Sequence, residues 1–162
     1  MGLSRNELKE LVAYNPDTGI WTRKVSRGRA KAGDIAGSIH PHGYRYIEIN
    51  GKQYPASRLA HLYMTGKWPE HTMDHINRIR DDDRWENLRP ATRTEQVINR
   101  GMQKNNKSRH KGVSWHKPTK KWQAYITVDK KQIHLGRFHD LDEAVAARKE
   151  AELKYFGEFV SV

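Results

Sequence analysis

The apolar residues of this chain occur in short runs that turn-forming residues interrupt. Only 36% of its 162 residues are hydrophobic and the mean hydropathy is −0.96. No stretch approaches the roughly 18 consecutive apolar residues that a membrane helix needs. Five Trp, seven Tyr and three Phe provide anchors for small cores. We therefore expect a soluble protein with no membrane partner, built from folded modules of fewer than about 100 residues each.

Basic side chains predominate and are unevenly distributed. The chain has 30 Lys and Arg against 19 Asp and Glu, with a pI near 9.9. Residues 101–139 hold ten basic residues and one acidic residue, whereas residues 140–162 hold three basic and six acidic ones. Such a charge favours a polyanionic partner, most often nucleic acid. Its distribution indicates a basic binding face followed by an acidic supporting helix.

The chain contains no cysteine, and its N-terminus, MGLSRNELKELVAYNPDTG, lacks the apolar core and cleavage site of a secretory signal. Missing cysteine removes disulfide scaffolds, thiol nucleophiles and Cys-ligated zinc. These features fit a reducing cytoplasm. A structural-zinc protein is a weak alternative, because the nine histidines lack closely spaced ligand pairs.

Turn signals divide the first half into short elements. A short amphipathic helix that contains Leu8, Leu11 and Val12 precedes a predicted strand at 19–22 and a basic loop at 24–37. Residues 44–49 alternate up to Asn50-Gly51, a strong hairpin signal, and residues 53–56 form the return strand. A helix is expected over 58–65, ending near 66.

The C-terminal part predicts a three-stranded meander and one helix. Residues 112–116, 122–128 and 132–136 have strand patterns separated by Lys-rich turns. Asp140 caps the following helix, whose alanines form a stripe that can lie close to the sheet. Alternation along the middle strand places Tyr125 and Ala124 on opposite faces.

The central segment 73–99 carries residues suited to phosphodiester cleavage. Asp74 and His75 place a hard oxygen ligand beside an imidazole. A carboxylate suits a magnesium-type ion, and an imidazole can take a proton from water at neutral pH. Asn87 could hydrogen-bond the imidazole or its backbone. Adjacent Asp and His are also common in ordinary loops, and the run of three aspartates at 81–83 is most simply a solvated turn.

The helix that follows completes this constellation. It begins at Thr92 or Thr94 and could direct Gln96 or Asn99 toward the same metal.

The segments DHIN, WENLRPAT and the following helix resemble the ββα-metal motif of HNH homing endonucleases, particularly the phage and intron-encoded group. TGIWT, AGSI and GYRYIEINGKQYPASRLAHLYMTGKWP resemble the preceding region, so the likeness spans about residues 14–100. The resemblance implies that Asp74 binds one Mg²⁺ or Mn²⁺, that His75 activates water and that Asn87 orients His75. It also implies 5′-phosphate and 3′-hydroxyl products and action in the cytoplasm of a bacterial host cell. The sequence gives no sign of an obligatory protein partner and leaves the oligomeric state open.

The chain departs from the family pattern at the third metal ligand, because the family usually has Asn where this chain has Gln96. The longer side chain still offers a carbonyl oxygen, and Asn99 is a less favoured substitute. Gln96 keeps an alternative open, namely a DNA-binding or regulatory protein whose nuclease site is degraded.

Residues 109–157 resemble the plant ethylene-response-factor DNA-binding domain, the Apetala-two type, through KGVSW, KWQAYI, HLGRF and EAVAA. The resemblance implies that a sheet binds the major groove of double-stranded DNA. The predicted DNA-binding positions are Lys111, Ser114, His116, Lys121, Trp122, Tyr125, Thr127, Gln132, His134 and Arg137.

Together these patterns predict an α+β protein in three parts. Residues 1–100 form an HNH nuclease domain with a β-rich N-terminal extension, and residues 101–110 form a basic linker. Residues 111–162 form the second module, a three-stranded antiparallel sheet packed on one helix.

Overall fold

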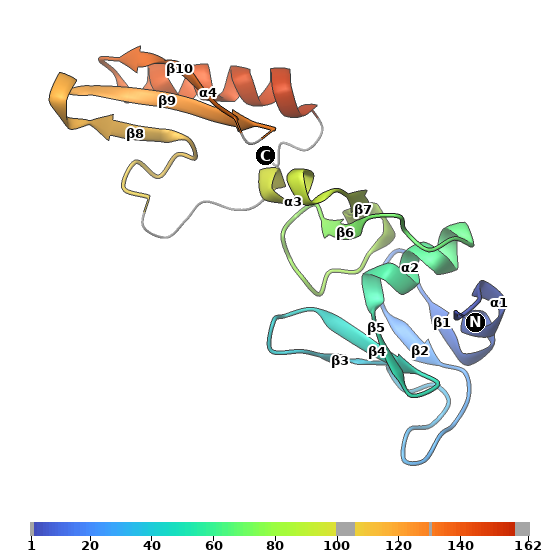
Figure 1. The fold of residues 1–162 in the computed structure, drawn as a ribbon. Coiled ribbons are helices and arrows are strands. Elements are labelled where there is room, and N and C mark those ends of the chain that lie inside the picture. Colours follow the sequence, from blue (N-terminus) through green and yellow to red (C-terminus); the bar gives the residue numbers. More distant parts are fainter. Residues whose placement is uncertain (1, 100–105, 130, 158–162) are drawn as a thin grey trace. The chain divides into compact units, whose positions relative to one another are not determined.

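The structure is a computed structural model that describes residues 2–99, 106–129 and 131–157 (Figure 1). It divides into two compact units, Met1–Arg93 and Thr94–Val162, each with a hydrophobic core of its own. The boundary lies before the predicted linker, of which residues 101–105 are outside the described part. The Lys111 ammonium donates to the Ile98 carbonyl at 2.7 Å, which ties helix α3 (Arg93–Asn99) to the second unit.

The first unit begins with α1 (Arg5–Leu11), whose N-cap Ser4 accepts a hydrogen bond from the Glu7 amide. The helix ends one residue before the predicted Val12, which begins strand β1 (Val12–Tyr14). This strand pairs antiparallel with β2 (Trp21–Arg23), and Tyr14 lies opposite Trp21. The β1 strand was not predicted, because three residues are too few to establish an alternating pattern.

A second sheet contains β3 (Ser38–Ile39), β4 (Arg45–Ile49) and β5 (Lys52–Pro55) in that order. The hairpin predicted from Asn50-Gly51 is present, and both residues have positive φ, at 51° and 75°. A turn with two positive φ values matches the right-handed twist of the flanking strands. Helix α2 (Ala56–Thr65) follows directly and ends at Gly66 in the left-handed conformation, φ 80°.

The core of the first unit lies between α1, α2 and these strands. Trp21 is fully buried, with the Tyr14 and Tyr63 rings at centroid distances of 4.6 and 5.7 Å. Leu8, Ile47 and Leu59 are also fully buried. Burying one such side chain stabilises a fold by about 1.5–3 kcal/mol, so this cluster gives the N-terminal residues a firm attachment to α2.

A third hairpin carries Asp74 and His75, for which the sequence predicts metal binding and catalysis. Strand β6 (Thr72–His75) pairs antiparallel with β7 (Leu88–Ala91), so that His75 lies opposite Leu88. The connecting loop, residues 76–84, leads into a short 3-10 helix at Trp85–Asn87. Helix α3 follows β7 in the chain, and all of it after Arg93 belongs to the second unit.

The second unit has β8 (Val113–His116), β9 (Lys121–Val128) and β10 (Lys131–Phe138), with β9 in the middle. Helix α4 (Leu141–Phe156) packs on this sheet through Ala144, against Val113 and Ala124. Ala144 and Ala151 of the predicted alanine stripe are buried, and so is Arg148 on the same helix.

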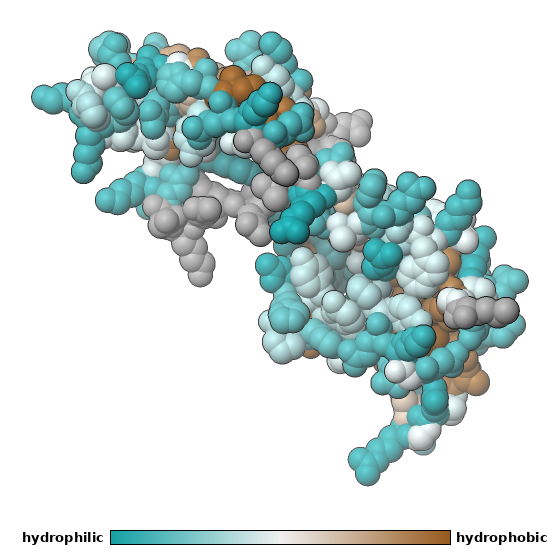
Figure 2. Space-filling model, viewed as in Figure 1, coloured by the Kyte–Doolittle hydropathy of each residue, from teal (hydrophilic) through white to brown (hydrophobic). Residues whose placement is uncertain are grey.

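The structure is therefore a mixture of helices and several small antiparallel sheets, as the fold class predicts. The face drawn in Figure 2 is mostly hydrophilic, in agreement with the low mean hydropathy. Within the described ranges, no helix has the length and apolar character required to cross a membrane.

Candidate active site

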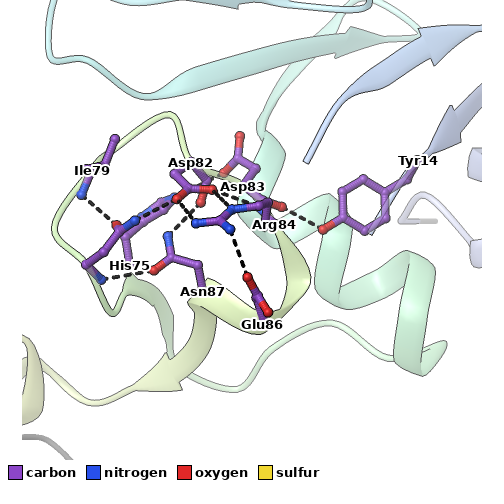
Figure 3. Close-up of polar contacts among 9 residues, drawn as sticks. Tyr14, His75, Ile79, Asp82, Asp83, Arg84, Glu86 and Asn87 are labelled. Atoms are coloured by element: carbon purple, nitrogen blue, oxygen red, sulfur yellow. Dashed lines mark hydrogen bonds and ion pairs between the residues drawn. The ribbon is translucent and has the colours of Figure 1, made fainter. Parts of the chain in front are cut away.

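His75, the last residue of β6, forms a buried pair with Asp83 (Figure 3). The imidazole Nε2 lies 3.1 Å from Asp83 Oδ1, and the two residues are only 5% and 2% exposed. The prediction that residues 81–83 form a solvated turn is wrong for Asp83. Of the three aspartates, only Asp81 is exposed, and Asp82 is half-buried. The three aspartates are alike in sequence, so no local signal distinguished the one that folds inward.

Asp82 forms hydrogen bonds with two other residues of the same loop. Its carboxylate accepts hydrogen bonds from Arg84 Nε and Nη2, both at 2.8 Å, and from Asn77 Nδ2 at 2.6 Å. The hydrogen bond from Arg84 lowers the pKa of Asp82 to about 2. Asp82 is therefore a charged brace for the loop at neutral pH.

Asn87 joins the two ends of this loop (Figure 3). Its Oδ1 accepts from the Asn77 amide at 2.9 Å, and its Nδ2 donates to the Asp82 carbonyl at 2.7 Å. Its backbone carbonyl accepts from the Ile76 amide, next to His75, at 2.9 Å. These hydrogen bonds fix the loop backbone next to His75. Through them, Asn87 would orient the imidazole by holding the backbone and not by contacting the ring.

Asp74 is paired with Arg89 across the hairpin. The two residues are directly opposite in the β6–β7 register, and Asp74 Oδ2 accepts from Arg89 Nε and Nη2, each at 3.2 Å. Both side chains are largely buried, at 13% and 15% exposure. A partly buried ion pair is screened less than a surface pair, so Arg89 competes with any cation for this carboxylate.

The chemistry of Asp74 fits a divalent metal that is shared with a phosphate. A hard ion such as Mg²⁺ takes one or two carboxylates and completes its shell with water and phosphate oxygens. Within residues 2–99, 106–129 and 131–157, no three or more His, Asp or Glu side chains are grouped so as to hold a metal ion.

Gln96 and Asn99 lie on α3, in the second unit. Gln96 is half-buried and Asn99 is 3% exposed. The role of Gln96 as a metal ligand remains a prediction.

The sheet of the second unit brings most of the predicted DNA-binding residues to one face. Residues directly opposite in antiparallel strands share a face, and alternate residues along a strand do too. Tyr125 lies opposite His134, and from this pair the strand register identifies the residues that share one face of the sheet. Of the ten predicted positions it contains Ser114, His116, Lys121, Tyr125, Thr127, Gln132, His134 and Arg137, and we call this set the outer face.

Two predicted positions lie elsewhere. Trp122 is opposite both Trp115 and Phe138 on the other face, and it packs against the core that α4 covers. A role in the core is therefore enough to account for a tryptophan at this position, with no contact to DNA required. Lys111 precedes β8 and bonds to the Ile98 carbonyl.

The outer face also contains Gln123, which the predicted set omitted. Its Nε2 donates to Ser114 Oγ at 3.0 Å. Beneath the sheet, buried Arg148 donates to the Tyr125 carbonyl at 3.1 Å and pairs with Glu152 at 2.8 Å. Helix α4 thus supports the strand that carries Tyr125.

Comparisons with known proteins give a family match that includes the β6–β7 hairpin. Residues 54–97 match the HNH endonuclease family model, so this segment is an HNH endonuclease domain. The chain is 36% identical over 87 residues to Protein 3.8 of Escherichia phage T7, a match that covers 54% of this chain and 71% of that protein. The chain belongs to the same family as this phage protein.

A solved structure described as "DNA binding and cleavage by the HNH homing endonuclease I-HmuI" is also similar. The identity is 22% and the TM-score 0.42, and the match covers 55% of this chain. The chain spans about half, 51%, of the length of that protein.

Proposed function

We propose that this protein is a metal-dependent DNA endonuclease that hydrolyses phosphodiester bonds in double-stranded DNA. The observation that carries the proposal is the position of His75 within the HNH domain. Its imidazole is held at the end of β6 by a braced loop, and the adjacent residue is the carboxylate Asp74. A general base and an oxygen ligand for a hard cation are the two groups that such a hydrolysis needs.

In this mechanism His75 takes a proton from the attacking water, and Asn87 keeps the His75 backbone in place through the loop. Asp74 and Gln96 would hold one Mg²⁺ or Mn²⁺ ion, which when bound would stabilise negative charge on the phosphate. The products would be a 5′-phosphate and a 3′-hydroxyl. A single site acts on one strand, so a monomer would produce a nick.

The outer face of β8, β9 and β10 would bind the DNA backbone and major groove. Its support is the gathering of eight predicted positions on one side of a sheet whose other side packs on α4. Lys121 and Arg137 provide positive charge there, and Thr127, Gln132 and His134 are exposed hydrogen-bonding groups. This arrangement suits a protein of a phage or mobile element that acts on DNA in the bacterial cytoplasm.

A second candidate is a DNA-binding or regulatory protein whose nuclease site does not function. The Asp74–Arg89 ion pair favours it, because a bound guanidinium opposes cation binding at that carboxylate. Gln96 in the place of the usual Asn points in the same direction.

Plasmid nicking with Mg²⁺ or Mn²⁺ separates the two candidates. The purified wild type should convert supercoiled plasmid to the nicked form, and His75→Ala should bind DNA equally but not cut it. Cutting by both proteins would indicate a contaminant or another base. Binding without cutting by the wild type, across both metals and several DNA sequences, would support the regulatory candidate.

A further inference from the structure

We propose that Asp83 is the positioning residue for His75, and that the N-terminal β1–β2 segment holds Asp83 in place. The proposal rests on the proposed nuclease function and deepens it. It assigns a role to a side chain that the sequence pattern did not single out, and it links the HNH domain to residues outside the matched segment 54–97.

The burial of Asp83 is costly and requires an explanation. Its Oδ2 is buried and has no hydrogen-bond partner in the described part of the chain, while Oδ1 has His75. A buried carboxylate with an unsatisfied oxygen destabilises a fold, and buried pairs of this kind are weak evidence for stability. A role in orienting the imidazole accounts for keeping this group in the interior.

The geometry assigns different tasks to the two imidazole nitrogens. A carboxylate oxygen accepts hydrogen bonds, so Nε2 is the nitrogen that carries hydrogen toward Asp83. In neutral imidazole the other nitrogen, Nδ1, is then the acceptor that can take a proton from water. The Tyr44 ring also lies beside the imidazole, with the two ring centroids 5.7 Å apart.

Three contacts from residues 14–19 fix the backbone that carries Asp83. The Tyr14 hydroxyl donates to the Asp83 carbonyl at 2.6 Å, and the Trp85 amide donates to the Pro16 carbonyl at 2.8 Å. Gly19 packs so closely that a Cβ would lie 2.6 Å from the Asp83 carbonyl carbon. The Tyr14–Asp83 hydrogen bond joins residues 69 positions apart, so these contacts place the loop relative to β1 and β2.

Tyr14 is suited to this task at any physiological pH. Burial, together with the negative charge of Asp83, raises the pKa of its hydroxyl well above the ordinary value. The hydroxyl therefore keeps its proton and remains a donor to the Asp83 carbonyl.

The first test measures which imidazole nitrogen carries hydrogen, without metal or DNA. Long-range ¹H–¹⁵N NMR at about pH 8, above the ordinary histidine pKa, distinguishes the two tautomers, and loss of one signal in His75→Gln assigns it. We expect the Nε2–H form in the wild type, in Asp83→Asn, whose amide oxygen still accepts, and in the exposed-residue control Asp81→Asn. Asp83→Leu should give a mixture of forms. An Nδ1–H form in the wild type, or no change in Asp83→Leu, would overturn the proposal.

The second test separates positioning from folding. Asp83→Leu should lower kcat for plasmid nicking about 100-fold, the cost of a small misplacement of a reacting group, while the Kd for DNA stays within twofold. Asp83→Asn should recover most of that loss. Equal losses in the two variants would show that a hydrogen-bond acceptor at position 83 does not restore the rate. That result would contradict the orienting role.

Failure of the nuclease function itself would give a distinct result. A wild type that binds DNA and never cuts it removes the proposed activity, yet the tautomer measurement still decides whether Asp83 orients His75.

Discussion

Asp74 and Arg89 face each other across the β6–β7 hairpin, with two guanidinium nitrogens each 3.2 Å from the same carboxylate oxygen. Asp74 is the carboxylate that we propose as a ligand for the metal ion. A cation that binds at Asp74 must do so beside an existing positive charge.

Arg89→Gln should therefore tighten the binding of Mn²⁺ to the DNA-free protein. Removing one positive charge from a largely buried pair favours the incoming ion by about tenfold in Kd. Isothermal titration calorimetry measures this, with Arg29→Gln, an exposed residue of the same unit, as the control. Unchanged or weaker binding in Arg89→Gln would remove Asp74 as the ligand.

Gln96→Asn should leave nicking activity equal to or higher than that of the wild type, because it restores the shorter amide found in the related family pattern. The rate of plasmid nicking at several Mg²⁺ concentrations provides the measurement. A sharp loss of activity with unchanged DNA binding would show that Gln96 is not a metal ligand.

Substituting Lys121 and Arg137 together by Gln should weaken DNA binding and flatten its salt dependence. Each phosphate contact contributes roughly 0.9 to the slope of log K against log salt, so the slope should fall by about two. Fluorescence anisotropy at several salt concentrations measures it. Lys149 and Lys154 lie exposed on α4, and the same double substitution there should leave the slope unchanged.

The Asp82–Arg84 brace should make part of the stability depend on acid pH. The pKa of Asp82 is lowered from 3.8 to about 2 by folding, so its contribution is complete above pH 3.8 and is lost as the pH falls toward 2. Because the pair is partly exposed, the effect should stay below about 1 kcal/mol. Urea unfolding of the wild type and Asp82→Asn should differ above pH 4 and converge near pH 2.

Gly19→Ala should destabilise the protein and reduce nicking. A Cβ at this position would lie 2.6 Å from both the Asp83 carbonyl carbon and the Arg84 amide nitrogen, and φ is +71°. We expect a loss of about 2–4 kcal/mol in urea unfolding.

Gly28→Ala is the matched control, because Gly28 has a similar φ of +61° but nothing within 4 Å of its Cβ. It should lose only the cost of the left-handed backbone, about 1 kcal/mol. Equal losses in the two variants would show that the contact with the Asp83 backbone has no effect of its own.

Local patterns in the sequence were sufficient for several elements. The Asn50-Gly51 turn, the end of α2 at Gly66 and the three strands of the second unit depend on residues close together in the chain. The identities of Asp74 and His75, and their place in an HNH motif, were also visible, since adjacent residues with distinct chemistry form a compact signature.

The tertiary structure decided which of several residues of the same type is buried and which partner it has. Asp81, Asp82 and Asp83 have the same side chain, but only Asp83 is buried against His75, because Tyr14 and Gly19 hold its backbone from a distant part of the chain. Strand register likewise placed Trp122 in the core and Tyr125 on the outer face. Contacts between segments far apart in the sequence determine which side chains are buried and which groups they contact. The local spacing of residues does not contain this information.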